Sequence, residues 1–253
     1  MFKGSKFQGI SINNWDVSNV LNFANMFQDT PLFNEPLNGW DTSAGRFFGS
    51  MFAGASVFNQ PLSNFIFSNA TSINFMFYEA TAFNQPIGNW NVGSVTTILM
   101  MFAGGNPSQY SPFDQPLNSW DVSNVTDMQT VFGFSVFNQP LNNWNVSSVT
   151  TMKSMFLGNV TYNQDISSWN TSLFSNMISM FNDADSFNQD ISSWDISSVT
   201  SLNAIFSDSD SFNQNLSSWD TSNITNMNFA FRNADSFNED LSNWDVSSVD
   251  TMS

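Results

Sequence analysis

Large apolar side chains recur along this chain at one fixed spacing. All nine tryptophans stand at the same position of a tandem unit, with Phe65 filling one slot between them, and the step is 25 residues except for a 30-residue step and a 24-residue step that meet at Trp120. A period of about 20 to 50 residues is typical of a solenoid. The pattern therefore predicts one array of roughly ten stacked repeats over residues 1–253. The tryptophans are Trp15, Trp40, Trp90, Trp120, Trp144, Trp169, Trp194, Trp219 and Trp244.

The unit FNQPLNNWNVSSVTTMKSMFLGNVT, at residues 137–161, predicts the elements of one repeat. Trp144 and Val146 flank Asn145, and this alternation indicates a short parallel strand with Trp and Val inward and Asn outward. The next apolar positions are separated by steps of three, three and one, so they share one face of a short helix or 3-10 turn. They are Val149, Met152, Met155 and Phe156. One strand and one crossover per 25 residues predict an α/β solenoid.

This layout is that of a leucine-rich repeat, here with Trp in the middle of the Leu-x-x-Trp-x-Val core. The sequence resembles the BspA-like leucine-rich repeats of bacterial and protist surface proteins, and more closely the repeats of mycoplasma-type surface lipoproteins. The resemblance is carried by FNQPLNSWDVSNVTDM at 113–128, FNQDISSWDISSVTSL at 187–202 and FNEDLSNWDVSSVDTM at 237–252. It implies an open right-handed solenoid on a surface, with an adhesive or structural role and no active site.

The array begins and ends within a repeat. Met1 and Phe2 correspond to the Met-Phe pair that closes a unit, and the last residues, SSVDTMS, stop in mid-repeat. Because solenoids normally carry polar caps, we expect this chain to be a segment of a longer array. Five extra residues within 104–112 predict a loop that projects from one face.

Composition excludes several classes of partner and chemistry. The chain has 5 Lys and Arg against 21 Asp and Glu, a net charge of −16, which repels nucleic acid and anionic membranes. It has neither Cys nor His, so Ser-His-Asp, Cys-His and Cys- or His-bound metal chemistry are excluded. No stretch approaches the roughly 18 to 20 apolar residues of a membrane span. The remaining carboxylates recur repeat after repeat, whereas an active site would be an irregularity at one repeat, so we expect no enzyme.

Two further rows of equivalent residues are predicted to be structural. The Phe that opens each unit predicts an aromatic column in the core, and the Asn that follows it predicts a row of amides that satisfy backbone groups of the turns. The aromatic row is Phe33, Phe58, Phe83, Phe113, Phe137, Tyr162, Phe187, Phe212 and Phe237. The amide row is Asn34, Asn59, Asn84, Asn138, Asn163, Asn188, Asn213 and Asn238, with Asp114 once.

The residue after each Trp is the candidate for partner binding. It points to solvent beside an inward side chain, on the strand surface where leucine-rich repeats usually bind partners. Two interpretations stay open: a solvated polar row, or a multivalent surface for a partner or for cations. The row comprises Asp16, Asp41, Asn91, Asp121, Asn145, Asn170, Asp195, Asp220 and Asp245, with Ile66 in the third repeat.

Acidic residues concentrate in the C-terminal repeats, as in DADSFNQD and DSDSFNQN. Carboxylate and amide oxygens are hard ligands of the kind that calcium takes, but the glycine and the bidentate Glu of an EF-hand loop are missing. The pattern leaves open weak calcium binding and, more simply, solvated turn acids; no other cofactor is expected. The candidate ligands are Asp183, Asp185, Asp190, Asp208 and Asp210.

Sequons for N-glycosylation are frequent, as chance produces in a repeat built from Asn, Ser and Thr. They become informative only for a eukaryotic secretory source. The candidate acceptors are Asn69, Asn124, Asn159, Asn215 and Asn223.

Taken together, the sequence favours a non-enzymatic array in the extracellular space or on a cell surface. It would act in adhesion or recognition of a protein or glycan surface through the row beside the tryptophans. The alternative is a structural subunit whose copies stack end to end into a filament or a surface layer, as uncapped head-to-tail contacts do.

Overall fold

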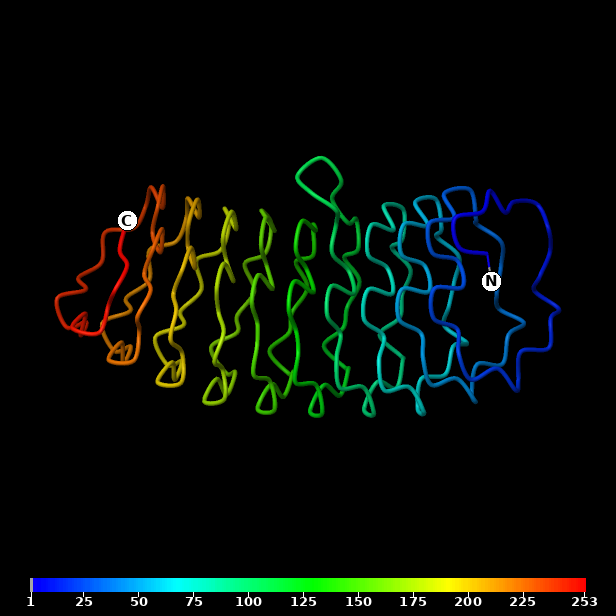
Figure 1. Ribbon diagram of the computed structural model, residues 1–253, viewed down its shortest axis with the longest axis horizontal. Helices are drawn as coiled ribbons and strands as arrows, with labels where there is room; N and C mark the ends of the chain where they lie inside the picture. Colours follow the sequence, from blue (N-terminus) through cyan, green and yellow to red (C-terminus); the bar gives the residue numbers. More distant parts are fainter. Residues whose placement is uncertain (1) are drawn as a thin grey trace.

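The computed structural model describes residues 2–253 and shows an elongated stack of coils with the two termini at opposite ends (Figure 1). Each coil is one repeat, so residues about 25 positions apart lie on neighbouring coils. A loop in the middle of the chain projects from one edge of the stack (green in Figure 1). This loop is residues 105–110, where the sequence predicts a projection.

Residues 2–253 contain no regular helix and no strand longer than a single bridge residue. The coils consist of turns, and parallel bridges join one residue of each coil to its equivalent on the next, as in Asp127–Thr151 and Thr151–Asn176. The expected short strand and short helix therefore differ from the structure. Membership of the leucine-rich-repeat class and the right hand of the solenoid stay predictions.

The segment expected to be a strand is a pair of turns. Trp144 and Val146 are buried and Asn145 is exposed, which confirms the predicted alternation. However, the Trp144 amide donates to the Leu141 carbonyl at 3.0 Å, and the Val149 amide donates to the Val146 carbonyl at 2.9 Å. These local bonds bend the backbone on both sides of the Trp. The bridge residue is Thr151, further along the coil.

The segment expected to be a helix, residues 149–158 and its equivalents, is here called the ladder segment. Amides of alternate residues donate along the stack: those of Met152, Ser154 and Phe156 reach carbonyls of the next coil at 2.9–3.0 Å. The amides between them donate within the coil, as from Met155 to the Met152 carbonyl at 3.1 Å and from Leu157 to the Ser154 carbonyl at 3.1 Å. A short helix is marginal by itself, whereas this arrangement joins every coil to its neighbours.

Left-handed backbone recurs at two slots of the ladder segment. Ser154 has φ 56° and Gly158 has φ 64°, each at the third position of a turn, where type II turns require positive φ. Positive φ is incompatible with a helix, which is the local reason why the apolar spacing does not produce one. At the second slot the positive-φ residues are Gly4, Asp29, Gly54, Glu79, Phe134, Gly158, Asp183, Asp208 and Asn233.

Aromatic rings fill the core as two columns in contact. In one coil Phe132 stacks on Phe137 with ring centroids 3.9 Å apart, and Phe132 also stacks on Phe156 of the next coil at 5.9 Å. The same pairing recurs along the stack, for example between Phe206 and Phe212 at 3.8 Å. The aromatic column is confirmed, and its second row is the Phe of the ladder segment.

The tryptophans also fasten neighbouring coils together. Each indole Nε1 from Trp40 onward donates to the carbonyl of the Leu or Ile that lies three positions before the equivalent Trp of the preceding coil, at 2.9–3.2 Å. Trp169, for example, donates to Leu141 at 3.2 Å. Trp15, on the first coil, is 42% exposed.

In the third coil, Phe65 replaces the tryptophan, and a neighbouring side chain provides the hydrogen-bond donor. The Phe65 side chain has no N–H to donate to the Leu37 carbonyl, which is the equivalent acceptor on the preceding coil. The Nδ2 of the adjacent Asn64 lies 3.4 Å from that carbonyl and 3.0 Å from the Trp40 carbonyl. Asn64 therefore supplies the donor that Phe65 lacks.

The amide row is confirmed as a structural feature. The Oδ1 of Asn138 accepts from the Asn163 amide of the next coil at 3.0 Å and from the Gln164 Nε2 at 3.0 Å. Asp114 takes the same role, accepting from the Asn138 amide at 2.9 Å and from the Gln139 Nε2 at 3.0 Å. From Asn34 to Asn188, each side-chain oxygen of the row thus satisfies two donors of the following coil.

Candidate functional site

All nine Asp and Asn side chains of the row beside the tryptophans are exposed. Each is ordered by a local turn in which its Oδ1 accepts the amide of the residue two positions later. Asp195 accepts from the Ser197 amide at 3.0 Å and from the Ser197 hydroxyl at 2.7 Å. Asn145 accepts from the Ser147 amide at 3.2 Å. The geometry is an Asx turn. It uses Oδ1, so Oδ2 of each exposed Asp can bind water or a partner.

These turns keep the row ionised. Hydrogen bonds from the hydroxyl and amide of Ser197 lower the pKa of Asp195, and the charge of Asp220 on the next coil raises it by a smaller amount. The pKa of Asp220 is lowered in the same way by Ser222. Local serines therefore outweigh the repulsion between carboxylates on neighbouring coils, so the row carries its full charge near neutral pH.

The calcium candidates do not form a ligand cage. Within residues 2–253, no group of three or more Asp or Glu side chains is placed to hold a metal ion. Asp190 is occupied in an Asx turn with the Ser192 amide at 2.9 Å. Asp208 accepts from Asn233 Nδ2 at 2.7 Å and lies 3.8 Å from Arg232. The arrangement fits the simpler interpretation, in which these are turn acids. Asp190 also lines a polar cleft of about 280 Å³ with Ser192, Gln214, Asn215, Ser217 and Ser218.

The glycosylation candidates differ in access. Asn159 is fully buried, and its Nδ2 donates to the Phe137 carbonyl at 3.0 Å. The same nitrogen also donates to the Ser135 hydroxyl at 3.3 Å, so a glycan, which leaves it one hydrogen, would break one of the two bonds and open the core. The prediction for Asn159 is therefore wrong. Asn69, Asn124, Asn215 and Asn223 are exposed. The Nδ2 groups of three of them, all but Asn215, are tied to carbonyls of the preceding coil.

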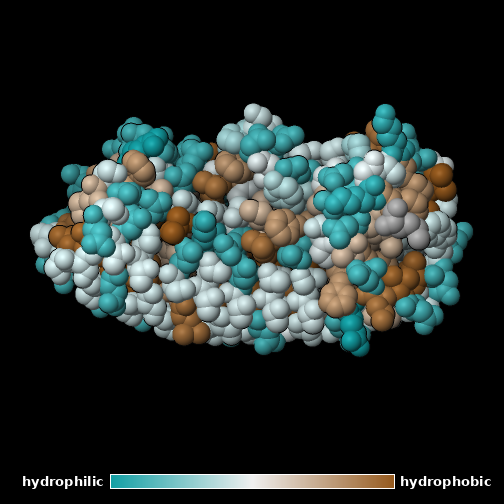
Figure 2. Space-filling view, in the orientation of Figure 1, coloured by the Kyte–Doolittle hydropathy of each residue, from teal (hydrophilic) through white to brown (hydrophobic). Residues whose placement is uncertain are grey.

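A second candidate surface lies under the projecting loop. The Tyr110 ring meets the Phe134 ring edge to face at a centroid distance of 6.3 Å. Phe134 and Leu157 are half-buried on neighbouring coils, and Val136 is exposed. Figure 2 shows apolar side chains gathered below the loop at the middle of this face, bordered by hydrophilic ones. Tyr110, Phe134, Val136 and Leu157 are here called the Tyr110 patch.

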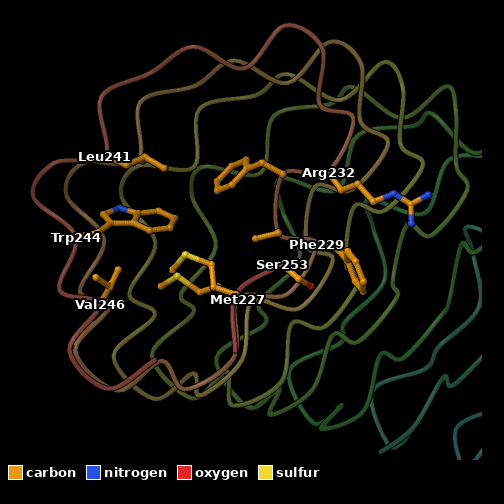
Figure 3. A pocket seen from close by; sticks show the side chains of 10 residues that line it. Met227, Phe229, Arg232, Leu241, Trp244, Val246 and Ser253 are labelled. Carbon is orange, nitrogen blue, oxygen red and sulfur yellow. The ribbon is translucent and has the colours of Figure 1, made fainter. Parts of the chain in front are cut away.

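The C-terminal end of the stack exposes the edge of the core. A cavity of about 350 Å³ opens there, with Met227, Leu241 and Trp244 turned into it (Figure 3). Val246 and Met252 on its rim are 48% and 61% exposed. Most of the side chains that line this cavity are apolar.

The sequence matches the family model described as "Mycoplasma protein of unknown function, DUF285" three times in succession, over residues 1–112, 108–216 and 189–253. The chain belongs to the DUF285 family. Together the three matches cover the whole chain, which establishes it as a tandem-repeat protein. Comparison with curated proteins and with solved structures gave no match. Across residues 2–253 of this DUF285 chain, no helix has the length and apolar character needed to cross a membrane.

Sequence reasoning missed two features of the DUF285 repeat. The indole N–H bonds explain why Trp rather than Leu occupies the slot. The sequence gives no sign of them, because Asn precedes several tryptophans as well as Phe65. The Tyr110 patch could have been suspected because the 30-residue and 24-residue steps are consecutive. The 30-residue step adds a loop to one coil, and the 24-residue step removes one residue from the next coil. Because the two coils are neighbours, both changes affect the same part of the surface.

Proposed function

We propose that this DUF285 chain is a non-enzymatic extracellular array that acts in adhesion or recognition through the Asp and Asn row beside its tryptophans. The observation that carries the proposal is that all nine members are exposed and held by the same local turn. Ordered side chains lose less conformational freedom on binding than flexible ones. Repetition at one-coil spacing multiplies weak contacts into avidity.

Placement on a cell surface is part of the same proposal. It draws on family membership, on the low share of charged residues (10%) with abundant Asn, Ser and Thr, and on the resemblance to BspA-like leucine-rich repeats and to mycoplasma-type surface lipoproteins. The expected partner is a protein or glycan surface, because a net charge of −16 disfavours nucleic acid.

The chain itself supplies a clean probe for this row. Asn91, Asn145 and Asn170 make the same turn as the aspartates, with the amide two residues later 3.2 Å from Oδ1. Asp→Asn substitution in the row should therefore remove charge and keep the backbone.

The test is binding of the purified chain to a panel of immobilised extracellular matrix proteins and glycans. The triple variant Asp195→Asn, Asp220→Asn, Asp245→Asn should bind at least about tenfold more weakly. The matched control removes the same charge from similar Asx turns on another row: Asp165→Asn, Asp190→Asn, Asp240→Asn. Equal losses for the two triples, or no binding by the wild-type chain, would remove the row from the proposal.

A second candidate function, end-to-end assembly, is favoured by the apolar cavity at the C-terminal end (Figure 3). The N-terminal end is apolar as well: Phe2 and Phe7 are half-buried with ring centroids 4.3 Å apart, and Trp15 is exposed. The apolar end of one copy would cover that of the next by a head-to-tail contact.

Sedimentation at increasing concentration tests this assembly. Trp244→Asp and Met252→Asp together should abolish concentration-dependent growth, since they place charge in the cavity. A wild-type chain that stays monomeric at high concentration, with no fibres by electron microscopy, removes the assembly function.

A further inference from the structure

The Tyr110 patch is the place where the array departs from its own regularity. The loop at 105–110 folds back on the stack, because the Ser111 amide donates to the Phe134 carbonyl at 2.8 Å and the Val136 amide donates to the Ser111 carbonyl at 3.1 Å. A parallel bridge between Ser111 and Ser135 fixes the base of the loop. Tyr110 is thereby held against Phe134 rather than free in solvent.

Phe134 has an unfavourable backbone conformation for an aromatic residue. Its φ is 46°, and seven of the nine positive-φ residues at this slot are Gly, Asn or Asp, which tolerate left-handed backbone. A bulky residue there stores strain. The Phe134 ring also lies across the neighbouring Gly158, where any side chain would overlap it. The fold does not need an aromatic ring here, so its presence points to a role at the surface.

Uncompensated negative charge borders the patch. Burial raises the pKa of Tyr110 most, and the nearby carboxylates of Asp183 and Asp185 raise it further. The pKa of Asp183 is itself raised, first by burial and then by Asp208 and Asp210. The one ion pair within residues 2–253 joins Arg232 to Asp208, so no ion pair in this range neutralises Asp183 or Asp185.

On the basis of the proposed recognition role, we infer that the Tyr110 patch docks a short basic segment of a partner protein in which Lys or Arg alternates with apolar side chains. The apolar residues of that segment would cover Phe134, Val136 and Leu157. The aliphatic stem of a Lys or Arg would lie along Tyr110, with its charge toward Asp183 and Asp185. Charge complementarity selects this partner: the apolar surface alone would accept many, and the acids reject acidic ones.

The probe is a synthetic peptide of alternating Lys and Leu, titrated calorimetrically into the chain. It should bind with one-to-one stoichiometry, and raising salt from about 50 to about 200 mM should weaken it. A Lys-Ser peptide, which keeps only the charge, and a Glu-Leu peptide, which keeps only the apolar side chains, should both fail. If the Lys-Ser peptide bound as tightly as the Lys-Leu peptide, binding would be nonspecific charge attraction and the inference would be overturned. It would also be overturned if the Lys-Leu peptide did not bind.

Variants locate the site. Phe134→Gly places at this slot the residue found at Gly54 and Gly158, so the chain should fold while the affinity falls at least about tenfold. The matched control is Phe229→Gly, which removes another left-handed aromatic ring, 42% exposed, from a distant coil. It should leave binding unchanged; a loss equal to that of Phe134→Gly would contradict the placement.

A double substitution of two carboxylates tests the inference independently of the Phe134 variant. Asp183→Asn with Asp185→Asn should weaken binding of the Lys-Leu peptide and flatten its salt dependence, whereas the control pair Asp165→Asn with Asp240→Asn should not. Equal effects of the two pairs would overturn the inference. A chain that binds the peptide at this patch but no matrix protein or glycan would keep the docking site and lose the adhesive role.

Discussion

At the scale of single residues, one backbone carbonyl per coil acts as a fixed acceptor for the next coil. Eight tryptophans fill it with an indole N–H, and Asn64 fills it where Phe65 stands. The sequence predicts that the Trp slot is buried, because apolar periodicity reports burial. It does not predict the hydrogen bond, because the acceptor lies 27 to 33 residues away and belongs to the backbone.

Removal of an indole N–H should therefore cost more than the lost ring area. Trp169→Phe removes one of the two donors to the Leu141 carbonyl, which keeps its bond from the Trp144 amide, so we expect the lost hydrogen bond to cost about 0.5–1.5 kcal/mol in the free energy of unfolding. Urea denaturation measures it. Trp15→Phe is the control, since Trp15 is partly exposed at the end of the stack and should cost less.

The third coil offers the reciprocal experiment. Asn64→Ala should destabilise the chain, and Phe65→Trp should recover part of that loss by restoring the donor to Leu37, although the bond to the Trp40 carbonyl stays lost. A double-mutant cycle isolates this coupling. Additive effects of the two substitutions would contradict the exchange of donors.

Left-handed positions give a stabilising prediction. Thr130 is β-branched and has φ 53°, at the slot that Asn25 occupies with φ 58° in the first coil. Because β-branched residues are strained there, Thr130→Asn should raise the free energy of unfolding by about 1 kcal/mol. Thermal denaturation checks it, with Thr151→Asn, at a bridge position, as the control expected to gain nothing.

At the scale of elements, the inward and outward positions were predictable and the backbone path was not. Val149, Met152, Met155 and Phe156 are all buried, as their spacing requires. The same spacing fits a helix and a run of turns, and only the positive φ at Ser154 and Gly158 distinguishes them. Single residues such as Phe75 and Phe134 adopt positive φ with no local sequence signal, because pairing with the neighbouring coils imposes it.

The amide row predicts a difference between middle and end coils. Asn163 accepts from the Asn188 amide at 3.0 Å and from the Gln189 Nε2 at 2.8 Å, so Asn163→Ala should cost about 1–2 kcal/mol. Asn238 stands at the last position of the row among the described residues and accepts no bond from a later coil there. Asn238→Ala should cost clearly less in the same denaturation experiment, and equal losses would contradict the ladder.

The two kinds of carboxylate respond to acid in opposite directions. The pKa of Asp195 is lowered by Ser197, so its stabilising contribution is present at neutral pH and is lost as the pH falls through the folded-state value. Asp183 and Asp185 have raised pKa values, chiefly from burial, so their ionisation opposes folding at neutral pH. Protonation relieves this as the pH falls through the raised values toward the ordinary 3.8.

Asp183→Asn with Asp185→Asn should accordingly raise the melting temperature near pH 7. The gain should shrink as the pH falls through the raised values and disappear well below 3.8, where the wild-type carboxyls are protonated in both states. Melting curves across this range test the sign; a gain that persists in acid would point to packing rather than charge.

At the scale of the whole molecule, each coil contacts only its neighbours, so stability is expected to be a sum over coils and their contacts. Deletion of residues 187–211 removes one full period. The shortened chain should remain folded, with a smaller denaturant dependence of unfolding in proportion to its length. Deletion of residues 187–198 puts the columns out of phase and should prevent folding, as judged by urea denaturation.

The overall architecture was the most predictable level, because the tryptophan period alone implies a stack. The site was less so: the row beside the tryptophans follows from alternation, whereas the Tyr110 patch depends on contacts between two irregular coils. The irregular 30-residue and 24-residue steps show where the repeat changes, but they do not predict which side chains come into contact there.

The repeated indole bond also has a spectroscopic consequence. Seven tryptophans are buried and share one donor geometry, and Trp244 has the same bond in a half-buried setting, so their emission should overlap in a single band. Trp15, on the first coil, is the most exposed tryptophan, at 42%, and its indole N–H has no acceptor within residues 2–253. A water-soluble quencher should remove its red-shifted share first, which makes intrinsic fluorescence a label-free report on whether that end of the array is covered.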